Sequence, residues 1–215
     1  MLSRQTKAAD EAQREVGNVA IRDYATGLLN RPGIAETIQE RLDRRESIAL
    51  INMDLDNFKK INDLYGHLAG DEMLRAVAER LVQVTPVGAA CARLGGDEFA
   101  ILLCGEAAGR EKVFAIAEGI QDALGEPVKV GGGITKIRAS IGIYAQVEDG
   151  SSVADMFRRS DIAMYEAKKA GGSQICLFEN TMEAVVQQRY QMETEIREGI
   201  PKGEFVPFYQ PQYGI

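Results

Sequence analysis

The fold is decided by one stretch of the sequence, Cys91-Ala-Arg-Leu-Gly-Gly-Asp-Glu-Phe-Ala-Ile-Leu-Leu103. Two short apolar runs, residues 91–94 and 99–103, flank a polar centre, and such runs joined by a Gly-Gly pair predict a β-hairpin. Gly95 and Gly96 supply positive φ at the turn without steric cost and let a ligand approach the backbone. Asp97 and Glu98 lie side by side at the tip, where two negative charges are unfavourable unless a cation neutralises them. A divalent metal carrying a polyphosphate would do so, and a solvated hairpin tip is the alternative.

A buried strand upstream leads into a second acidic segment. Ser47-Ile-Ala-Leu-Ile-Asn-Met53 is almost continuously apolar, which predicts a central strand buried on both faces. Asp54 and Asp56 follow it, and ligands of open α/β sheets bind beyond the carboxyl ends of strands. A calcium-binding loop would need an oxygen ligand and then a glycine where this chain has Phe58 and Lys59, which excludes that interpretation. The segment therefore predicts a ligand site at the end of a central strand, followed by a helix.

Composition limits the classes of function open to the chain. Its 215 residues allow one full domain with appendages, and 45% hydrophobic and 27% charged residues are ordinary for a globular protein. A net charge of −7 argues against general binding to nucleic acid or an anionic membrane, but not against a nucleotide held through a metal ion. No apolar run is long enough to span a bilayer, so any membrane attachment would lie outside this sequence. Three cysteines without metal-type spacing predict reduced thiols in a cytoplasmic protein.

Further motifs occur in order around these two segments. They are Asp23-Tyr-Ala-Thr-Gly-Leu-Leu-Asn-Arg31, Asn62-Asp-Leu-Tyr-Gly-His67, Gly70-Asp71, Ser140-Ile-Gly-Ile143 and Asp161-Ile-Ala-Met-Tyr-Glu-Ala-Lys168. Together with Gly95-Gly96-Asp97-Glu98-Phe99, they resemble the GGDEF family, the diguanylate cyclases of bacterial second-messenger signalling. The resemblance covers residues 23–178 and is far more specific than a match to the five-residue signature alone.

The order of predicted elements agrees with the fold that the resemblance implies. We expect an α/β (α+β) domain whose central, mostly antiparallel sheet is flanked by helices, similar to the palm of nucleotide cyclases and polymerases. Helices are predicted at about 32–45, 57–63, 69–84, 109–124 and 153–170, and strands at about 47–53, 91–94, 99–103, 128–130, 134–145 and 175–178.

Three regions are expected along the chain. Residues 1–22 are charged and alanine-rich and predict a linker helix, with a frayed tail as the alternative. Residues 23–178 form the GGDEF domain. Residues 179–215 begin with a polar helix, and the tail from Pro201 onward looks like the truncated start of an EAL domain, the cyclic-di-GMP phosphodiesterase module. An EAL domain in the same parent chain is therefore an implied partner.

The resemblance implies that the chain condenses two GTP molecules into cyclic di-GMP and releases two pyrophosphates. Each protomer would hold one GTP, so catalysis would need a homodimer. Mg²⁺ or Mn²⁺ would offset the charge that develops as a ribose 3′-hydroxyl attacks an α-phosphate. The implied metal ligands are Asp54, Asp97, Glu98 and the carbonyl of Leu55, and the implied catalytic residues are Asp97 and Glu98.

The other implied residues bind GTP, and they are Asn57, Phe58, Lys59, Asn62, Asp71, Gly95, Gly96 and Lys168. Asn57, Phe58 and Lys59 lie at the start of a predicted helix. Their N–H groups and the helix dipole suit the binding of a phosphate. Asn62 and Asp71 can together satisfy the O6 acceptor and the N1 and N2 donors of guanine. Lys168 resembles a phosphate contact.

Two places depart from the family pattern. Pro86 and Ala89 occupy the positions of the family's Arg-x-x-Asp inhibitory site, which predicts no tight product feedback there. After Lys168 the family usually has Gly-Arg-Asn, whereas this chain has Gly171-Gly172-Ser173. Because the loss of this arginine would weaken phosphate binding, the alternative function is that of a GTP-binding module that regulates an adjoining EAL phosphodiesterase. A third possible function is that of a pure dimerisation scaffold.

Three polar residues have structural interpretations beside functional ones. We expect Asp56 to hold a turn rather than a metal. His67, the only histidine, is expected to pack or cap a helix rather than to catalyse. Arg93 either pairs with an acid across the hairpin or contributes to the site.

Overall fold

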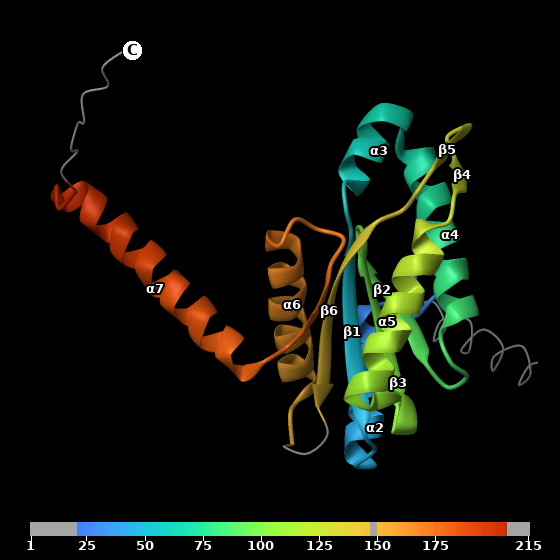
Figure 1. Cartoon of the computed structure of the whole chain (residues 1–215), viewed down its shortest axis with the longest axis horizontal. Helices are drawn as coiled ribbons and strands as arrows, with labels where there is room; N and C mark the ends of the chain where they lie inside the picture. The colour runs from blue at the N-terminus through green and yellow to red at the C-terminus, as the bar shows by residue number, and fades with distance from the viewer. Residues whose placement is uncertain (1–20, 147–149, 206–215) are drawn as a thin grey trace, which may run out of the picture. The chain divides into compact units, whose positions relative to one another are not determined.

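The computed structural model describes residues 21–146 and 150–205 (Figure 1). The chain divides into two compact units after Phe178. The linker helix predicted for residues 1–22 lies outside the described residues, apart from its last two positions. The first unit holds the sheet and every labelled helix up to α6 (Val153–Lys169).

The first unit is built on a five-stranded sheet in the order β2-β3-β1-β6-β7. The strands are β1 (Ile48–Leu55), β2 (Ala90–Gly95), β3 (Glu98–Cys104), β6 (Ala139–Gln146) and β7 (Ile175–Leu177). All neighbouring strands are antiparallel except β6 and β7, which are parallel. The expected α/β fold with a central, mostly antiparallel sheet is therefore confirmed. The central strand β1 is buried throughout except at Asp54, which is half-buried.

The register of the sheet aligns the two acidic segments. On β1, Met53 lies opposite Phe99 of β3, and Asp54 lies opposite Glu98. Strands β2 and β3 form the predicted hairpin, with a register shift between Arg93 and Gly95. The hairpin tip and the carboxyl end of β1 therefore share one edge of the molecule.

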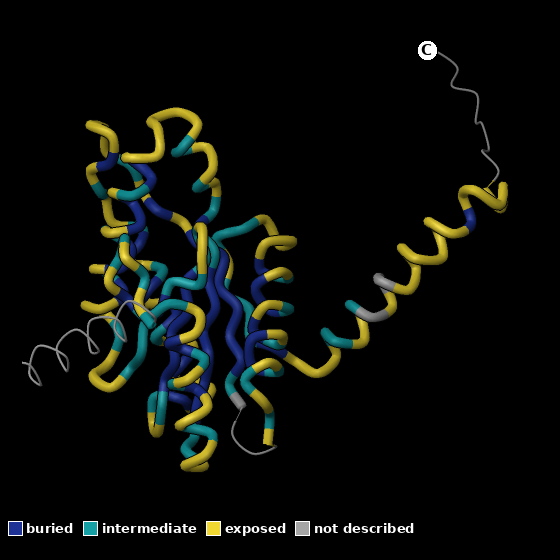
Figure 2. The backbone as a smooth tube through the Cα atoms, turned by 180° about the vertical axis from the view of Figure 1, so that it is seen from behind, coloured by how far each residue is buried: buried dark blue, intermediate teal, exposed yellow. Residues whose placement is uncertain are grey.

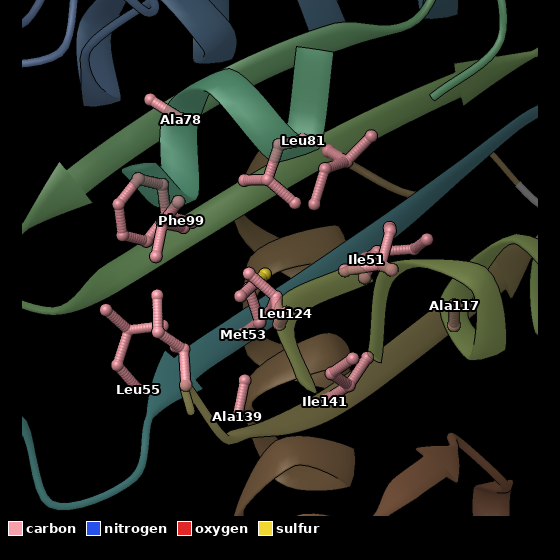
Figure 3. Close-up of a cluster of buried hydrophobic side chains, with 14 of the residues drawn as sticks. Ile51, Met53, Leu55, Ala78, Leu81, Phe99, Ala117, Leu124, Ala139 and Ile141 are labelled. Atoms are coloured by element: carbon pink, nitrogen blue, oxygen red, sulfur yellow. The ribbon is translucent and has the colours of Figure 1, made fainter. Parts of the chain in front are cut away.

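One face of the sheet is covered by α4 (His67–Val84) and α5 (Arg110–Gly125), as Figure 1 shows. Alternate residues of β1 point toward these helices, and Figure 3 shows Ile51 and Met53 among side chains of α4 and α5 such as Leu81 and Leu124. All four of these side chains are almost completely inaccessible to solvent. Burial of each contributes about 1.5–3 kcal/mol relative to exposure, so this layer fixes the position of β1.

The opposite face is covered by α2 (Arg31–Asp43) and α6. Helix α2 starts at Asn30, whose side chain accepts a hydrogen bond from the Gly33 N–H, and it has a proline in its first turn. Helix α6 starts with a reciprocal capping box between Ser152 and Asp155. These caps decide where each helix begins, and the start of α6 in turn places its last turn, which carries Lys168, near the end of β1.

The segment after β4 (Val128–Val130) differs from the prediction of one strand over residues 134–145. A short strand β5 (Gly133–Thr135) pairs with β4 in a separate two-stranded sheet, and β6 begins only at Ala139. Between them, Ile137 is buried and its N–H donates to the Leu124 carbonyl. This anchor to α5 interrupts the strand, and apolar alternation alone could not reveal it. A short 3₁₀ helix, η1 (Gly105–Ala108), follows β3.

The second unit begins at Glu179, and its described part consists of α7 (Asn180–Lys202) and the residues up to Phe205. Figure 2 shows α7 exposed along most of its length, and its apolar residues Met192 and Ile200 are both more than half exposed. Most of the predicted EAL-like segment lies outside the described residues. In the described ranges, no helix combines the length and the apolar character that a membrane span requires.

Candidate functional site

The predicted metal-binding residues converge where β1 meets the hairpin. Asp54 lies opposite Glu98 in the sheet, and the Leu55 N–H donates to the Asp97 carbonyl over 3.2 Å. Because β1 and β3 are held together by their ladder, these four residues come from two strands yet occupy one edge. The structure thus brings Asp54, Leu55, Asp97 and Glu98 to one edge of the sheet.

The environment of Asp54 changes the pKa of its carboxyl. Burial raises the pKa of its carboxyl above the ordinary value, and the negative charges of Asp97 and Glu98 act in the same direction. Lys168 opposes this rise, because its Nζ lies 2.8 Å from the Asp54 Oδ2. Beside Asp54, the Lys168 ammonium carries a single positive charge, whereas Asp54, Asp97 and Glu98 carry three carboxyl groups, so this end of β1 favours an additional cation.

Glu98 has a partner that sequence reasoning missed. The Arg31 guanidinium, from the start of α2, lies 3.5 Å from the Glu98 Oε2, with both side chains partly exposed. Arg31 also lies over the Phe157 ring, 5.3 Å from its centroid. The two partners are 67 residues apart in the chain, so no local pattern could have paired them. The only signal available was that Arg31 ends the motif that begins at Asp23.

The donor set suits a small, hard divalent cation. Asp54, Asp97 and Glu98 provide carboxylate oxygens and Leu55 a carbonyl, which are ligands that Mg²⁺ prefers. Among the described residues, no three histidine, cysteine or acidic side chains lie so that they could hold a metal ion by themselves. Mg²⁺ is usually held by one or two carboxylates together with substrate phosphates.

A cleft of about 460 Å³ opens beside Asp54. It is lined by Asp54, Asp56, Asn57, Arg138, Lys168, Gly171, Gly172 and Ser173. Asn57 has left-handed backbone angles, with φ of 63°, and leads into α3 (Phe58–Tyr65). The first N–H groups of a helix have no intrahelical acceptor, so those of residues 57–59 are available to an anion at this end of the cleft.

Asp56 serves to tie together the loops around the cleft. Its Oδ1 accepts a hydrogen bond of 2.8 Å from the Ser140 hydroxyl, and its Oδ2 accepts one of 2.8 Å from the Ser173 N–H. These bonds join the end of β1 to β6 and to the loop after α6. They support the structural role predicted for Asp56 over metal binding.

The two predicted guanine contacts lie on adjacent helices. Asn62 is in α3 and Asp71 in the first turns of α4, and both are half-buried. A Cβ atom added at Gly70 would lie 2.1 Å from the Asn62 Oδ1, so glycine is required for this close approach. Asn62 therefore packs against α4 immediately beside Asp71.

Comparison with known proteins agrees with this geometry. The family model for the diguanylate cyclase GGDEF domain matches residues 20–174, which is well over half of the chain. The chain belongs to the GGDEF family. The family's signature motif, Gly-Gly-Asp-Glu-Phe, therefore forms the tip of the β2–β3 hairpin described above.

Two curated relatives are multifunctional or degradative enzymes by name. The chain is 35% identical over 205 residues to the bifunctional diguanylate cyclase/cyclic di-GMP phosphodiesterase MucR of Pseudomonas aeruginosa, covering 94% of this chain and 30% of MucR. It is 33% identical over 203 residues to the cyclic di-GMP phosphodiesterase PdeR of Escherichia coli, with coverage of 94% and 30%. The chain thus spans 30% of the length of these relatives.

Solved GGDEF structures share the fold. The GGDEF domain of PA1120 from Pseudomonas aeruginosa is 32% identical, with a TM-score of 0.69, and the match covers 77% of this chain and 99% of that one. The coiled coil and GGDEF domain of DgcB from Caulobacter crescentus, in complex with c-di-GMP, is 26% identical, with a TM-score of 0.71 and coverage of 81% and 94%.

Arg93 anchors the hairpin of this GGDEF domain to a segment outside it. The sequence left open whether Arg93 pairs with an acid across the hairpin or contributes to the site, and in the structure its NH1 lies 3.2 Å from both carboxylate oxygens of Asp23. Its Nε and NH2 donate to the Gly96 carbonyl over 3.0 and 2.8 Å. Although burial acts to raise it, the pKa of Asp23 is lowered by hydrogen bonds from Thr26 and Arg93. Arg93 therefore joins the hairpin tip to the turn before α2.

The structure shows the surroundings of the residues that depart from the family pattern. Pro86 and Ala89 line a second cleft of about 460 Å³, away from the acidic edge and mostly walled by apolar residues. Gly172 has φ of 75°, and a Cβ there would lie 3.3 Å from the Asp56 Oδ1. An arginine restored at Gly172 would thus adopt an unfavourable backbone conformation beside a carboxylate.

The remaining predictions concern the histidine and the cysteines. His67 is exposed at the first position of α4, so it begins the helix and does not pack in the core. The three cysteines, Cys91, Cys104 and Cys176, are partly buried. Burial raises the pKa of the Cys91 and Cys104 thiols, which keeps them protonated and unreactive at neutral pH.

Proposed function

We propose that this GGDEF domain is a diguanylate cyclase, which condenses two GTP molecules into cyclic di-GMP and releases two pyrophosphates. One observation carries the proposal: Asp54, Asp97 and Glu98 lie together at the end of β1, beside a cleft that also contains Lys168 and a helix N-terminus. An acidic edge next to a cleft large enough for a small molecule is the arrangement that metal-dependent nucleotidyl transfer requires.

The residues around the cleft would divide the recognition of GTP among them. The N–H groups of residues 57–59 and the Lys168 ammonium would bind phosphate oxygens. Asn62 and Asp71 would hydrogen-bond the edge of guanine. Gly95 and Gly96 are exposed, with no heavy atom within 4 Å of an added Cβ, so the hairpin backbone would lie close to the nucleotide.

Asp54, Asp97 and the Leu55 carbonyl would hold Mg²⁺ or Mn²⁺, with Glu98 beside a second ion. Such an ion supplies charge stabilisation at the transferring phosphate when it is bound. Glu98 or Asp97 would accept the proton of the attacking 3′-hydroxyl, and the ion pair with Arg31 would keep Glu98 oriented toward the site. Because one protomer would hold one GTP, the reaction needs two domains facing each other.

A second function deserves a test because of one observation. Lys168 is engaged with Asp54, and Gly172 replaces the arginine expected beside it, so cationic support for the phosphates is reduced. A domain of this kind could bind GTP without turnover and regulate a phosphodiesterase domain in the same parent chain. The name of PdeR, a cyclic di-GMP phosphodiesterase similar over nearly the whole chain, is consistent with such a partner.

The decisive experiment incubates the chain with GTP and Mg²⁺, at concentrations high enough to populate a dimer, and measures cyclic di-GMP by chromatography. Asp97→Asn removes one carboxylate charge and keeps the size of the side chain. Product formation is expected to fall about 100-fold or more, because several kcal/mol of charge stabilisation are lost. Asp122→Asn, on the exposed side of α5, is the matched control and should leave the rate unchanged.

The same assay distinguishes the two functions. GTP binding with no product at any protein concentration would contradict the cyclase proposal and support the regulatory one. An Asp97→Asn variant that retains the full rate would show that the acidic edge is not the reaction site.

A further inference from the structure

Two cationic side chains line the cleft beside Asp54, namely Lys168 and Arg138. Lys168 already lies 2.8 Å from the Asp54 carboxylate. Arg138 is exposed, and no hydrogen bond or ion pair of its guanidinium is found within residues 21–146 and 150–205. Asp56 also lines the cleft, and both of its carboxylate oxygens accept hydrogen bonds from other groups. Arg138 is therefore a cation in the cleft that is available to a ligand.

The backbone holds Arg138 in a defined position. Its carbonyl accepts a hydrogen bond of 2.9 Å from the Asp56 N–H, which ties it to the end of β1. Its neighbours Ile137 and Ala139 are both buried. With buried residues on either side, extended backbone directs the intervening side chain away from the core. The interruption between β5 and β6 thus presents Arg138 to the cleft.

We propose that Arg138 binds the triphosphate of GTP and takes over the role of the arginine that is absent at Gly172. This inference rests on the proposed binding of GTP in the same cleft. A guanidinium offers a planar fork of N–H donors that matches phosphate oxygens, and it stays charged at every physiological pH. Gly172 lines the same cleft, so Arg138 restores the cationic wall from a different element of the fold. The phosphate contact that the family makes from the position of Gly172 would then be made from Arg138 instead.

The test measures nucleotide affinity by calorimetry with Mg²⁺. The ligand is the α,β-methylene analogue of GTP, whose P–C–P linkage cannot release pyrophosphate. Arg138→Gln is expected to weaken its binding about 10- to 100-fold, as for the loss of a charge-assisted contact. Binding of guanosine, which has no phosphates, should be unchanged. Arg138→Lys keeps the charge but not the fork and should fall between wild type and Arg138→Gln.

Lys129→Gln is the matched control, because Lys129 is an exposed cation of β4 that does not line the cleft. It removes the same charge and should leave both affinities unchanged. Thermal melting of each variant verifies that the domain is folded.

The outcomes separate this inference from the proposed function. Tight binding of the analogue that Arg138→Gln leaves unchanged would overturn the role of Arg138 while GTP binding stands. If Arg138→Gln and Lys129→Gln lost the same affinity for the analogue, the effect would come from the net charge of the domain and not from a contact of Arg138. That result would also overturn the inference. If the wild-type chain does not bind the analogue at all, both the proposed function and the inference fail.

Discussion

Asp54 combines two opposing requirements within a single residue. Burial, followed by the charges of Asp97 and Glu98, raises the pKa of its carboxyl, whereas a metal ligand must be ionised. The Lys168 ammonium at 2.8 Å partly resolves the conflict. A divalent cation with its two charges would resolve it more fully, which gives the proposed metal its physical reason.

Gly142 shows how a single residue sets the distance between two layers. A Cβ at this position of β6 would lie 2.2 Å from both the Met164 nitrogen and the Ser160 carbonyl oxygen of α6. Backbone atoms cannot move aside as a side chain does, so Gly142→Ala must push α6 away from the sheet. We expect the free energy of unfolding to fall by about 3 kcal/mol, as for an overpacked core. Urea denaturation of the variant measures this loss.

The control for this prediction is the same substitution at an open position. Gly119 lies on the exposed side of α5, with no heavy atom within 4 Å of an added Cβ. Gly119→Ala should raise the free energy of unfolding by about 0.5–1 kcal/mol, because alanine loses less conformational entropy in a helix. If Gly142→Ala were as stable as wild type, the close packing of β6 on α6 would be wrong.

At the scale of elements, α6 begins with a capping box and carries the site residue Lys168 in its last turn. The Ser152 hydroxyl and N–H donate to the Asp155 carboxylate over 2.6 and 3.1 Å, and Arg158 adds a hydrogen bond of 3.2 Å. With the Ser152 hydroxyl as the largest cause, these bonds lower the pKa of Asp155 to about 2. The ionised carboxylate is therefore part of the capping box.

This pKa predicts an acid-dependent contribution to stability. Because the folded pKa of Asp155 is about 2 and its ordinary value is 3.8, the unfolded chain binds more protons between these values. The contribution is complete above pH 3.8 and is lost as the pH falls toward 2. Ser152→Ala should raise the pKa of Asp155 toward 3.8 and reduce that loss. Carboxyl NMR titration measures the pKa, and an unchanged value in Ser152→Ala would contradict the capping-box explanation.

At the scale of the whole molecule, the division after Phe178 places a buried aromatic at the last position of the first unit. Phe178 is 7% exposed, its N–H donates to the Ile143 carbonyl over 2.8 Å, and its ring meets Tyr144 edge to face at 5.6 Å. The residues that follow in α7 are largely exposed. We therefore infer that the GGDEF domain ends with Phe178 and that α7 adds little to its stability.

Two truncations test that boundary. A chain ending at Asn180 should melt within a few degrees of the full chain. A chain ending at Leu177 lacks only three more residues but loses Phe178, which is worth about 3 kcal/mol and hence roughly 6–12 °C in melting temperature. Differential scanning calorimetry compares the two. A large loss in the Asn180 truncation would show that the second unit stabilises the first.

The sequence by itself determined the features that depend on local chemistry. The apolar runs around Gly95 and Gly96 specify a hairpin, and the uninterrupted apolar run before Asp54 specifies a central strand, because each pattern reports burial and turn geometry within a few residues. The order of the motifs was sufficient to indicate the family, and the resemblance to that family implied a shared role for the acidic residues. Helix boundaries were predicted to within a few residues for the same reason.

Only the tertiary structure decided which distant groups meet. Glu98 pairs with Arg31 and Lys168 with Asp54, contacts between residues far apart in the chain that no spacing rule predicts. The interruption before β6, which places Arg138 in the cleft, arises from the burial of Ile137 and its hydrogen bond to α5. A sequence pattern records what each segment prefers alone. The partners of the charged groups depend on how the layers pack, and that packing is settled only when the whole domain folds.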